Sequence, residues 1–162
     1  MKPSERYDSL FQYYGTLQGV DPWLLKAQVA AESNFDPDAK SRVGALGLAQ
    51  FMPATWAELA MKKGWITPQA LVDPRDPEDA IRAQSVYMAW LIKETGDIKL
   101  ALAAYNAGIG RVKRIFLAHG LTWEIGSPQL PTETQAYVPK VMWTWRSYAQ
   151  PEKVGMERPR RD

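Results

Sequence analysis

The chain has 162 residues, of which 46% are hydrophobic and 23% are charged, a composition typical of one globular domain. It contains no cysteine, which excludes disulfides, a thiolate nucleophile and thiolate metal sites. The formal net charge of +2 is too small to indicate nucleic-acid binding, and no apolar run approaches the roughly 18 residues of a membrane span. We therefore expect a single domain over residues 1–150, a basic tail over residues 151–162 and no membrane insertion.

Helical patterns follow one another along the chain and are separated by short turns that contain proline or glycine. Apolar residues recur at helical spacing over about residues 4–18, which predicts a first helix. Asp21 followed by Pro22 has the pattern of an N-cap with proline at the first helical position, and predicts the start of the second helix. Pro53 is expected to begin a third helix in the same way.

The strongest helix start lies at Asp76 and Pro77, where further acidic residues occupy the positive end of the helix dipole. The helix that follows is apolar over much of its surface, so we expect it to be central and largely buried. Further helices are predicted over residues 97–107, 110–119 and about 132–149. Pro139 predicts an interruption of the last one. Alternating strand patterns are nearly absent, so the predicted fold class is all-α, with at most a small β element near residues 40–50.

Glu32 stands at the C-terminal end of the second predicted helix, directly before a turn over residues 34–37. The helix dipole is negative at this end, and the neighbouring side chains are apolar. Both effects penalise the ionised carboxylate and are expected to raise its pKa. A raised pKa suits a general acid that works near neutral pH.

Three separated segments carry distinctive patterns: Ala-Glu-Ser at 31–33 continued by Ser41 and by Gly-Ala-Leu-Gly-Leu-Ala-Gln-Phe-Met-Pro at 44–53, Leu-Ala-Ala-Tyr-Asn-Ala-Gly at 102–108, and Pro-Thr-Glu-Thr-Gln-Ala-Tyr-Val at 131–138. In this order they resemble the motifs of the soluble lytic transglycosylase catalytic domain, which is related to goose-type lysozyme. The resemblance covers roughly residues 20–145 and implies a lysozyme-like fold. Ala49 departs from the pattern, because the family often has methionine there, and we expect a slightly altered groove or local packing without loss of chemistry.

Carried over residue by residue, the resemblance implies that Glu32 is the catalytic acid and base. It further implies a sugar-binding groove lined by Ser41, Gln50, Met52, Tyr105 and Asn106, with Glu133 near the cleft. In this scheme Ser41 binds an N-acetyl group or Glu32, and the hydroxyl of Tyr105 lies near Glu32 or the substrate.

Structural interpretations stand beside these implied roles. Gln50 and Asn106 can satisfy backbone groups, and Asn106 begins an Asn-Ala-Gly sequence that is a good helix stop. Ser41 can be a turn residue and Tyr105 a core residue. Glu133 can serve only as an acidic residue in the first turn of a helix.

No second catalytic carboxylate is evident. Asp36 and Asp38 flank Pro37 and are interpreted as turn-forming and capping residues. The single histidine, His119, is interpreted as a helix cap, so no Ser-His-Asp triad is available. Metal-ligand spacings and phosphate-binding glycine loops are also missing, so we expect no metal and no cofactor.

Most glycosidases use two carboxylates, so a single one requires help from the substrate. The resemblance implies a peptidoglycan strand as the substrate and partner. Glu32 would protonate the β-1,4 bond between N-acetylmuramic acid and N-acetylglucosamine, then deprotonate the C6 hydroxyl that closes a 1,6-anhydro ring. A muramidase that hydrolyses the same bond with water is the enzymatic alternative. A wall-binding or virion structural protein without catalysis is the third possibility.

Residues 1–6 lack the apolar segment of a signal peptide. An enzyme that degrades peptidoglycan in the periplasm or cell wall then needs another route to its substrate. We therefore expect a bacteriophage endolysin released by a holin, or a virion-associated enzyme, acting as a monomer. A bacterial enzyme tied to a secretion apparatus, or one whose leader has been removed, is the alternative.

Overall fold

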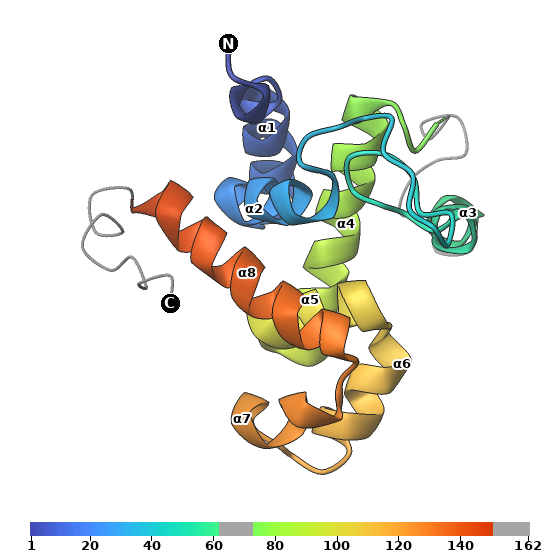
Figure 1. Cartoon of the computed structure of the whole chain (residues 1–162), viewed down its shortest axis with the longest axis vertical. Coiled ribbons are helices and arrows are strands. Elements are labelled where there is room, and N and C mark those ends of the chain that lie inside the picture. Colours follow the sequence, from blue (N-terminus) through green and yellow to red (C-terminus); the bar gives the residue numbers. More distant parts are fainter. Residues whose placement is uncertain (62–72, 151–162) are drawn as a thin grey trace.

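A computed structural model describes residues 1–61 and 73–150, and this part of the chain is built from helices (Figure 1). The α-helices are α1 (Asp8–Gln18), α2 (Pro22–Ser33), α3 (Pro53–Met61), α4 (Pro77–Thr95), α5 (Ile98–Ala107), α6 (Ile109–Val112), α7 (Trp123–Gly126) and α8 (Thr132–Ala149). Two 3-10 helices (Pro3–Glu5 and Ser127–Gln129) and a π-helical segment (Lys113–Leu117) complete the helical elements of these residues. The predicted basic tail, 151–162, lies outside the described residues.

The all-α prediction is confirmed. Over the described residues no strand forms, and two isolated antiparallel bridges join Lys40 to Leu46 and Leu46 to Phe51. These bridges are the small β element expected near residues 40–50. Within the same residues, no helix is both long and apolar enough to cross a membrane.

The predicted helix starts are also confirmed. The side chain of Asp21 accepts a hydrogen bond of 2.8 Å from the backbone N–H of Trp23 at the start of α2. Asp76 accepts one of 2.9 Å from the N–H of Asp79 at the start of α4. Proline at the first helical position therefore marks both starts together with a capping carboxylate.

Three predicted helices differ from the structure. The helix predicted over residues 110–119 is divided into α6 and the π-helical segment, which ends at Leu117. The helix predicted over residues 4–18 is divided, because a turn at Arg6 and Tyr7 separates the first 3-10 helix from α1. The interruption predicted at Pro139 is wrong, since α8 runs through it. Proline removes one helical N–H, which leaves the carbonyl of Gln135 without its usual donor. Gln135 and Pro139 are both exposed, so water can solvate that carbonyl and the helix continues.

The helices pack around one apolar core. α2 packs against α8 and α1, α4 packs against α1 and α5, and α5 packs against α8. As Figure 1 shows, α8 runs below α2 and past α5, whereas α3 projects on the other side of the molecule. Fully buried side chains from these elements fill the centre, among them Phe11, Leu24, Leu91, Leu102 and Val141. As predicted, α4 is central, with Ile81, Ser85 and Met88 all fully buried.

The segment between α2 and α3, here called the 34–52 loop, is held close to the core. The hydroxyl of Ser33 donates to the carbonyl of Leu48 at 2.8 Å and joins the loop to the end of α2. Gly47 has φ +77°, and a Cβ added there would lie 2.0 Å from the carbonyl oxygen of Pro74. Only glycine fits both conditions. The loop is therefore fixed at two points, next to the last turn of α2 and next to the segment that leads into α4.

Candidate active site

Glu32 is the penultimate residue of α2. The helix ends one residue later, at Ser33, because Asn34 adopts the left-handed conformation with φ 50°. The Glu32 side chain is partly buried between this helix end and α8. Burial raises the pKa of Glu32 from 4.5 to about 7, contact with Tyr137 lowers it, and the negative charge of Glu133 raises it. The carboxyl group can therefore exchange a proton near neutral pH, as the sequence-based expectation requires.

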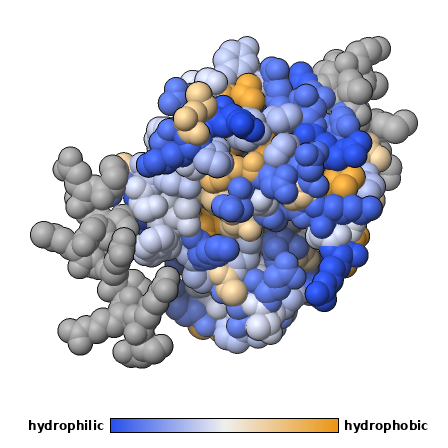
Figure 2. All heavy atoms as spheres, turned by 45° about the horizontal axis from the view of Figure 1, so that its top comes forward, coloured by the Kyte–Doolittle hydropathy of each residue, from blue (hydrophilic) through white to orange (hydrophobic). Residues whose placement is uncertain are grey.

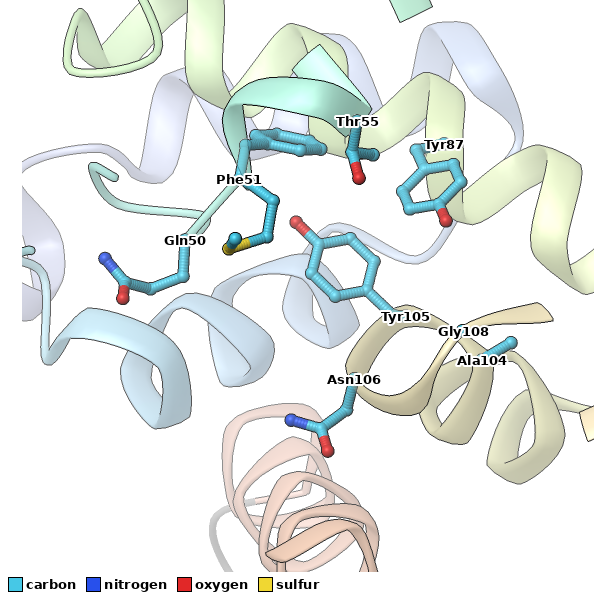
Figure 3. Close-up of a pocket in the computed structure, with 9 residues that line it drawn as sticks. Gln50, Phe51, Thr55, Tyr87, Ala104, Tyr105, Asn106 and Gly108 are labelled. Atoms are coloured by element: carbon cyan, nitrogen blue, oxygen red, sulfur yellow. The ribbon is translucent and has the colours of Figure 1, made fainter. Parts of the chain in front are cut away.

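Two adjoining hollows bring the predicted groove residues together. The first has a volume of about 570 Å³, and its lining includes Glu32, Ser41 and Gln50. The second has a volume of about 210 Å³, and Gln50, Met52, Tyr105 and Asn106 contribute to its lining (Figure 3). Gln50 lines both, so the two hollows meet at its side chain.

Tyr105 connects α5 to the 34–52 loop. Its hydroxyl donates a hydrogen bond of 2.8 Å to the carbonyl oxygen of Ala49. Figure 3 shows Phe51 and Tyr87 above the ring of Tyr105, and their ring centroids lie 5.9 and 5.4 Å from that of Tyr105. Burial raises the pKa of Tyr105 well above its usual range, and the nearby Glu32 charge adds to the effect. Tyr105 is thus close to Glu32, but its hydroxyl proton is committed to the loop.

Ser41 and Gln50 use part of their hydrogen-bonding capacity within the 34–52 loop. The Ser41 hydroxyl oxygen accepts a bond of 3.0 Å from the N–H of Ala45. The amide nitrogen of Gln50 donates to the carbonyls of Ala39 and Gly47 at 3.2 and 3.0 Å. The Ser41 hydroxyl oxygen and the Gln50 amide nitrogen thus satisfy backbone groups of the loop, as the structural interpretation of these residues predicted. The hydroxyl proton of Ser41 and the amide oxygen of Gln50 remain as groups that a ligand can use.

Asn106 lies where α5 approaches the first turn of α8. Its amide oxygen accepts a hydrogen bond of 2.7 Å from the hydroxyl of Thr134. The helix ends at Ala107, and Gly108 follows with φ 92°, so the Asn-Ala-Gly helix stop is confirmed. Asn106 therefore has the structural role that the sequence indicated and also lines the second hollow.

Helix α8 contributes residues on one side of Glu32. Glu133 is exposed in the first turn of the helix, and its charge acts on Glu32. Tyr137 is buried one turn further along and contacts Glu32 with its hydroxyl group. Lys140 lines the first hollow together with Lys40 from the loop. Sequence reasoning did not single out Tyr137 or the two lysines, although the i, i+3 and i+4 spacing of residues 133, 137 and 140 places them on one helix face.

The aspartates near Glu32 form a turn, as predicted. Asp36 and Asp38 are exposed, and the Asp36 side chain accepts a bond of 2.9 Å from the N–H of Asp38. Across residues 1–61 and 73–150, no group of three or more acidic or histidine side chains is arranged to hold a metal ion. Glu32 is the partly buried carboxyl that lines the groove, and Glu133 is the acidic neighbour that acts on it.

The comparisons with known proteins agree with this geometry. Residues 9–120 match the family model described as the transglycosylase SLT domain. The chain belongs to this family. It is 35% identical over 147 residues to the peptidoglycan transglycosylase gp16 of Escherichia phage T7, an alignment that covers 90% of this chain and 10% of that protein. It is 33% identical over 111 residues to the soluble lytic murein transglycosylase of Escherichia coli K12, covering 66% of this chain and 17% of that protein.

Solved structures of SLT lytic transglycosylases share the fold. The 70 kDa soluble lytic transglycosylase SLT70 of Escherichia coli superposes with a TM-score of 0.77 and 28% identity over 93% of this chain and 25% of that chain. An inactive mutant of the lytic transglycosylase Slt of Pseudomonas aeruginosa gives a TM-score of 0.76 and 29% identity, with the same coverage. The SLT domain here thus has the predicted lysozyme-like fold, and it spans a small part of the length of each of these relatives.

Proposed function

We propose that this SLT domain is a peptidoglycan lytic transglycosylase that cleaves the β-1,4 bond between N-acetylmuramic acid and N-acetylglucosamine and leaves a 1,6-anhydromuramoyl end. The observation that carries the proposal is the partly buried Glu32, with a pKa near 7, beside a groove formed by family motifs. The family membership and the similarity to the T7 and Escherichia coli transglycosylases support the choice of substrate.

Glu32 acts first as a general acid. It gives its proton to the glycosidic oxygen while the bond between that oxygen and C1 of N-acetylmuramic acid breaks. The N-acetyl oxygen of the same sugar stabilises C1, which replaces the second carboxylate used by most glycosidases. Burial and the charge of Glu133 favour the protonated starting form of Glu32.

Glu32 then acts as a base. As a carboxylate it takes the proton from the C6 hydroxyl of the same sugar, and the C6 oxygen bonds to C1. The ring closes without consuming water, and Glu32 regains the proton for the next cycle. An intramolecular nucleophile has a high effective concentration, which favours ring closure over attack by water. Tyr137 stabilises the carboxylate form of Glu32, which exists between the two proton transfers, by its contact with the carboxyl group.

The remaining groove residues bind and orient the glycan strand in this scheme. The free hydroxyl proton of Ser41 and the amide oxygen of Gln50 bind polar groups of the sugars. Met52, which is 39% exposed, provides an apolar contact surface in the second hollow. Asn106 contributes to the wall of that hollow, and Tyr105 keeps the 34–52 loop in place.

The biological setting that we propose is bacteriophage attack on the cell wall, as an endolysin or a virion-associated enzyme. The similarity to T7 gp16 over 90% of this chain supports a phage origin. A monomer suits this role, and the face shown in Figure 2 is mostly hydrophilic with small separate hydrophobic patches. This face therefore offers no large apolar interface to a second copy.

Product analysis tests the proposal. Purified peptidoglycan digested by the wild type and by Glu32→Gln is separated, and its muropeptides are identified by mass spectrometry. The proposal expects 1,6-anhydro ends from the wild type and none from Glu32→Gln. Reducing ends would instead indicate a muramidase, and binding without cleavage by the wild type would indicate a wall-binding protein. Equal cleavage by the two proteins would overturn the assignment of Glu32.

A further inference from the structure

Two buried glutamines lie behind Glu32, outside the groove. Gln28 precedes Glu32 by four residues on α2, so both side chains project from the same face of the helix. Gln84 reaches Gln28 from α4. Both residues are 0% exposed. Amides in a core cost free energy unless they are hydrogen-bonded, so their presence calls for a reason.

The hydrogen bonds of the pair have a defined direction. The amide nitrogen of Gln84 donates to the carbonyl of Leu25 at 3.0 Å and to the amide oxygen of Gln28 at 2.8 Å. A backbone carbonyl can only accept, so the nitrogen of Gln84 must face Leu25, and the oxygen of Gln28 must face Gln84. The nitrogen of Gln28 therefore points away from Gln84 and donates one hydrogen bond to the sulfur of Met88 at 3.6 Å. Its second N–H remains for another acceptor.

The hydroxyl of Tyr137 lies beside both Gln28 and Glu32. It is buried, and no partner in the described part of the chain meets full hydrogen-bond geometry. Burial raises the pKa of Tyr137 well above its usual range, the negative charge of Glu32 adds to this, and the contact with Gln28 opposes it. The amide of Gln28 and the carboxyl of Glu32 are thus polar neighbours of this hydroxyl, which has no other hydrogen-bond partner in the described residues.

We propose that Gln28 and Gln84 are positioning residues, which hold the hydroxyl of Tyr137 with its proton directed at Glu32. The order of donation is Gln84 to Gln28, Gln28 to Tyr137, and Tyr137 to the carboxylate. The phenol proton then stabilises the ionised form of Glu32, which the first chemical step produces. The inference rests on the proposed role of Glu32 as acid and base.

The other charged or titratable groups that face Glu32 are independent of the glutamine pair. Glu133 acts on it from α8, and Tyr105 lies near it on α5. Lys40 and Lys140 line the same hollow. Substitution of Gln28 leaves these groups in place, so a change in the titration of Glu32 can be assigned to the amide pair and Tyr137.

Gln28→Met tests the proposal, because it keeps the length of the side chain and removes the amide donor. The carboxyl carbon of Glu32, labelled with carbon-13 and assigned by comparison with Glu32→Gln, is expected to titrate at higher pH than in the wild type. The basic limb of the kcat/KM profile moves in the same direction. We expect kcat to fall about fivefold, the equivalent of one hydrogen bond, with KM unchanged.

Two further variants keep the test decisive. In Gln28→Met/Gln84→Met both amides are replaced together, so Gln84 is not left without its acceptor and the fold is preserved. Ser85→Ala is the matched control: Ser85 is also 0% exposed on α4, and its hydroxyl donates to the carbonyl of Arg82 at 2.7 Å. It is expected to lower the melting temperature slightly while the titration of Glu32 stays at the wild-type pH.

The route through Tyr137 is tested in a Tyr137→Phe background, where Gln28→Met is expected to cause no further shift. An unchanged Glu32 titration in both methionine variants would overturn the proposal, as would a shift that persists without the Tyr137 hydroxyl. The carbon-13 titration needs no substrate. A wild type that forms no anhydro products therefore refutes the proposed function, whereas an unshifted titration refutes the positioning role.

Discussion

Lys26 lies in the second turn of α2 and Glu32 in its last turn, and the two side chains are surrounded very differently. Lys26 is 6% exposed, its ammonium lies 2.7 Å from a carboxylate oxygen of Asp8, and the rings of Trp23 and Tyr148 are 5.3 and 4.9 Å away. Glu32 has no such cation within ion-pair distance in the described structure, and an acidic neighbour, Glu133, acts on it instead. One charge is stabilised by its surroundings, and the other is destabilised.

The surroundings of Lys26 suit a structural role, whereas those of Glu32 suit proton exchange, although both residues lie on the same helix. A buried charge with a partner and two aromatic rings contributes to the fold. A partly buried carboxyl that lacks a cation has a pKa near the working pH and can exchange protons. Variants at the two ends of α2 should therefore change different quantities.

The largest expected effect is on catalysis at the Glu32 end. Glu32→Gln keeps the shape of the side chain and removes its proton transfer, so we expect kcat to fall by about 10²- to 10⁴-fold. Because the substitution also removes an unfavourable charge, the melting temperature at pH 7 should not fall. Turbidity clearing of purified peptidoglycan and thermal unfolding measure the two quantities. A large loss of stability in Glu32→Gln would contradict the view that the Glu32 charge is destabilised in the folded protein.

The second prediction concerns the dependence of stability on pH. Burial raises the pKa of Glu32 from 4.5 to about 7, so the folded state binds more protons than the unfolded state between these values. The stabilisation is complete below pH 4.5 and is lost as the pH rises through 7. It amounts to at most about 3 kcal/mol over this interval. Urea unfolding of the wild type relative to Glu32→Gln from pH 4 to 8 measures it, and parallel curves would contradict the raised pKa.

The third prediction concerns the Lys26 end. Lys26→Met removes the partner of Asp8, whose side chain is 29% exposed, and should lower the free energy of unfolding by about 2 kcal/mol. The activity of the folded protein should be unchanged, because Lys26 lies away from the groove. Urea unfolding and muropeptide release at a temperature where the variant is folded provide the comparison. A loss of kcat as large as in Glu32→Gln would remove the distinction between the two ends.

The smallest expected effects come from a matched pair of polar side chains at the ends of α2. Asp21→Ala removes the N-cap and the bond of 3.1 Å from the indole of Trp145, and Ser33→Ala removes the bond to the carbonyl of Leu48. Each should cost about 1 kcal/mol of stability. Ser33→Ala should also raise KM, because it loosens the 34–52 loop, whereas Asp21→Ala should not. Equal KM values in the two variants would contradict this assignment.

The sequence predicted the features that depend on neighbours along the chain. Asp21 with Pro22 and Asp76 with Pro77 carry their capping chemistry within a few residues, so both helix starts could be predicted. The place of Glu32 in the last turn of α2 could be predicted for the same reason, and its catalytic role stays a proposal. The four-residue helix α7 was not predicted, since it is too short to show a periodic pattern.

The parts that could not be predicted depend on contacts between distant segments. Gln28 and Gln84 are separated by 56 residues, and each alone suggests an exposed position on a helix. The contact of Tyr137 with Glu32 follows only from the packing of α8 on α2. The interruption predicted at Pro139 was wrong because the packing of α8 outweighs the local preference of proline against helix.

The contact between Gly47 and Pro74 has a geometric consequence for the groove. With no room for even one methyl group at this point, the loop that forms one wall cannot move closer to the segment that leads into α4. The clearance between that wall and Glu32 is therefore fixed by where the chain enters α4. A change in the start of α4 would widen or narrow the passage for a sugar ring, although no residue of α4's first turn lines the hollow that contains Glu32.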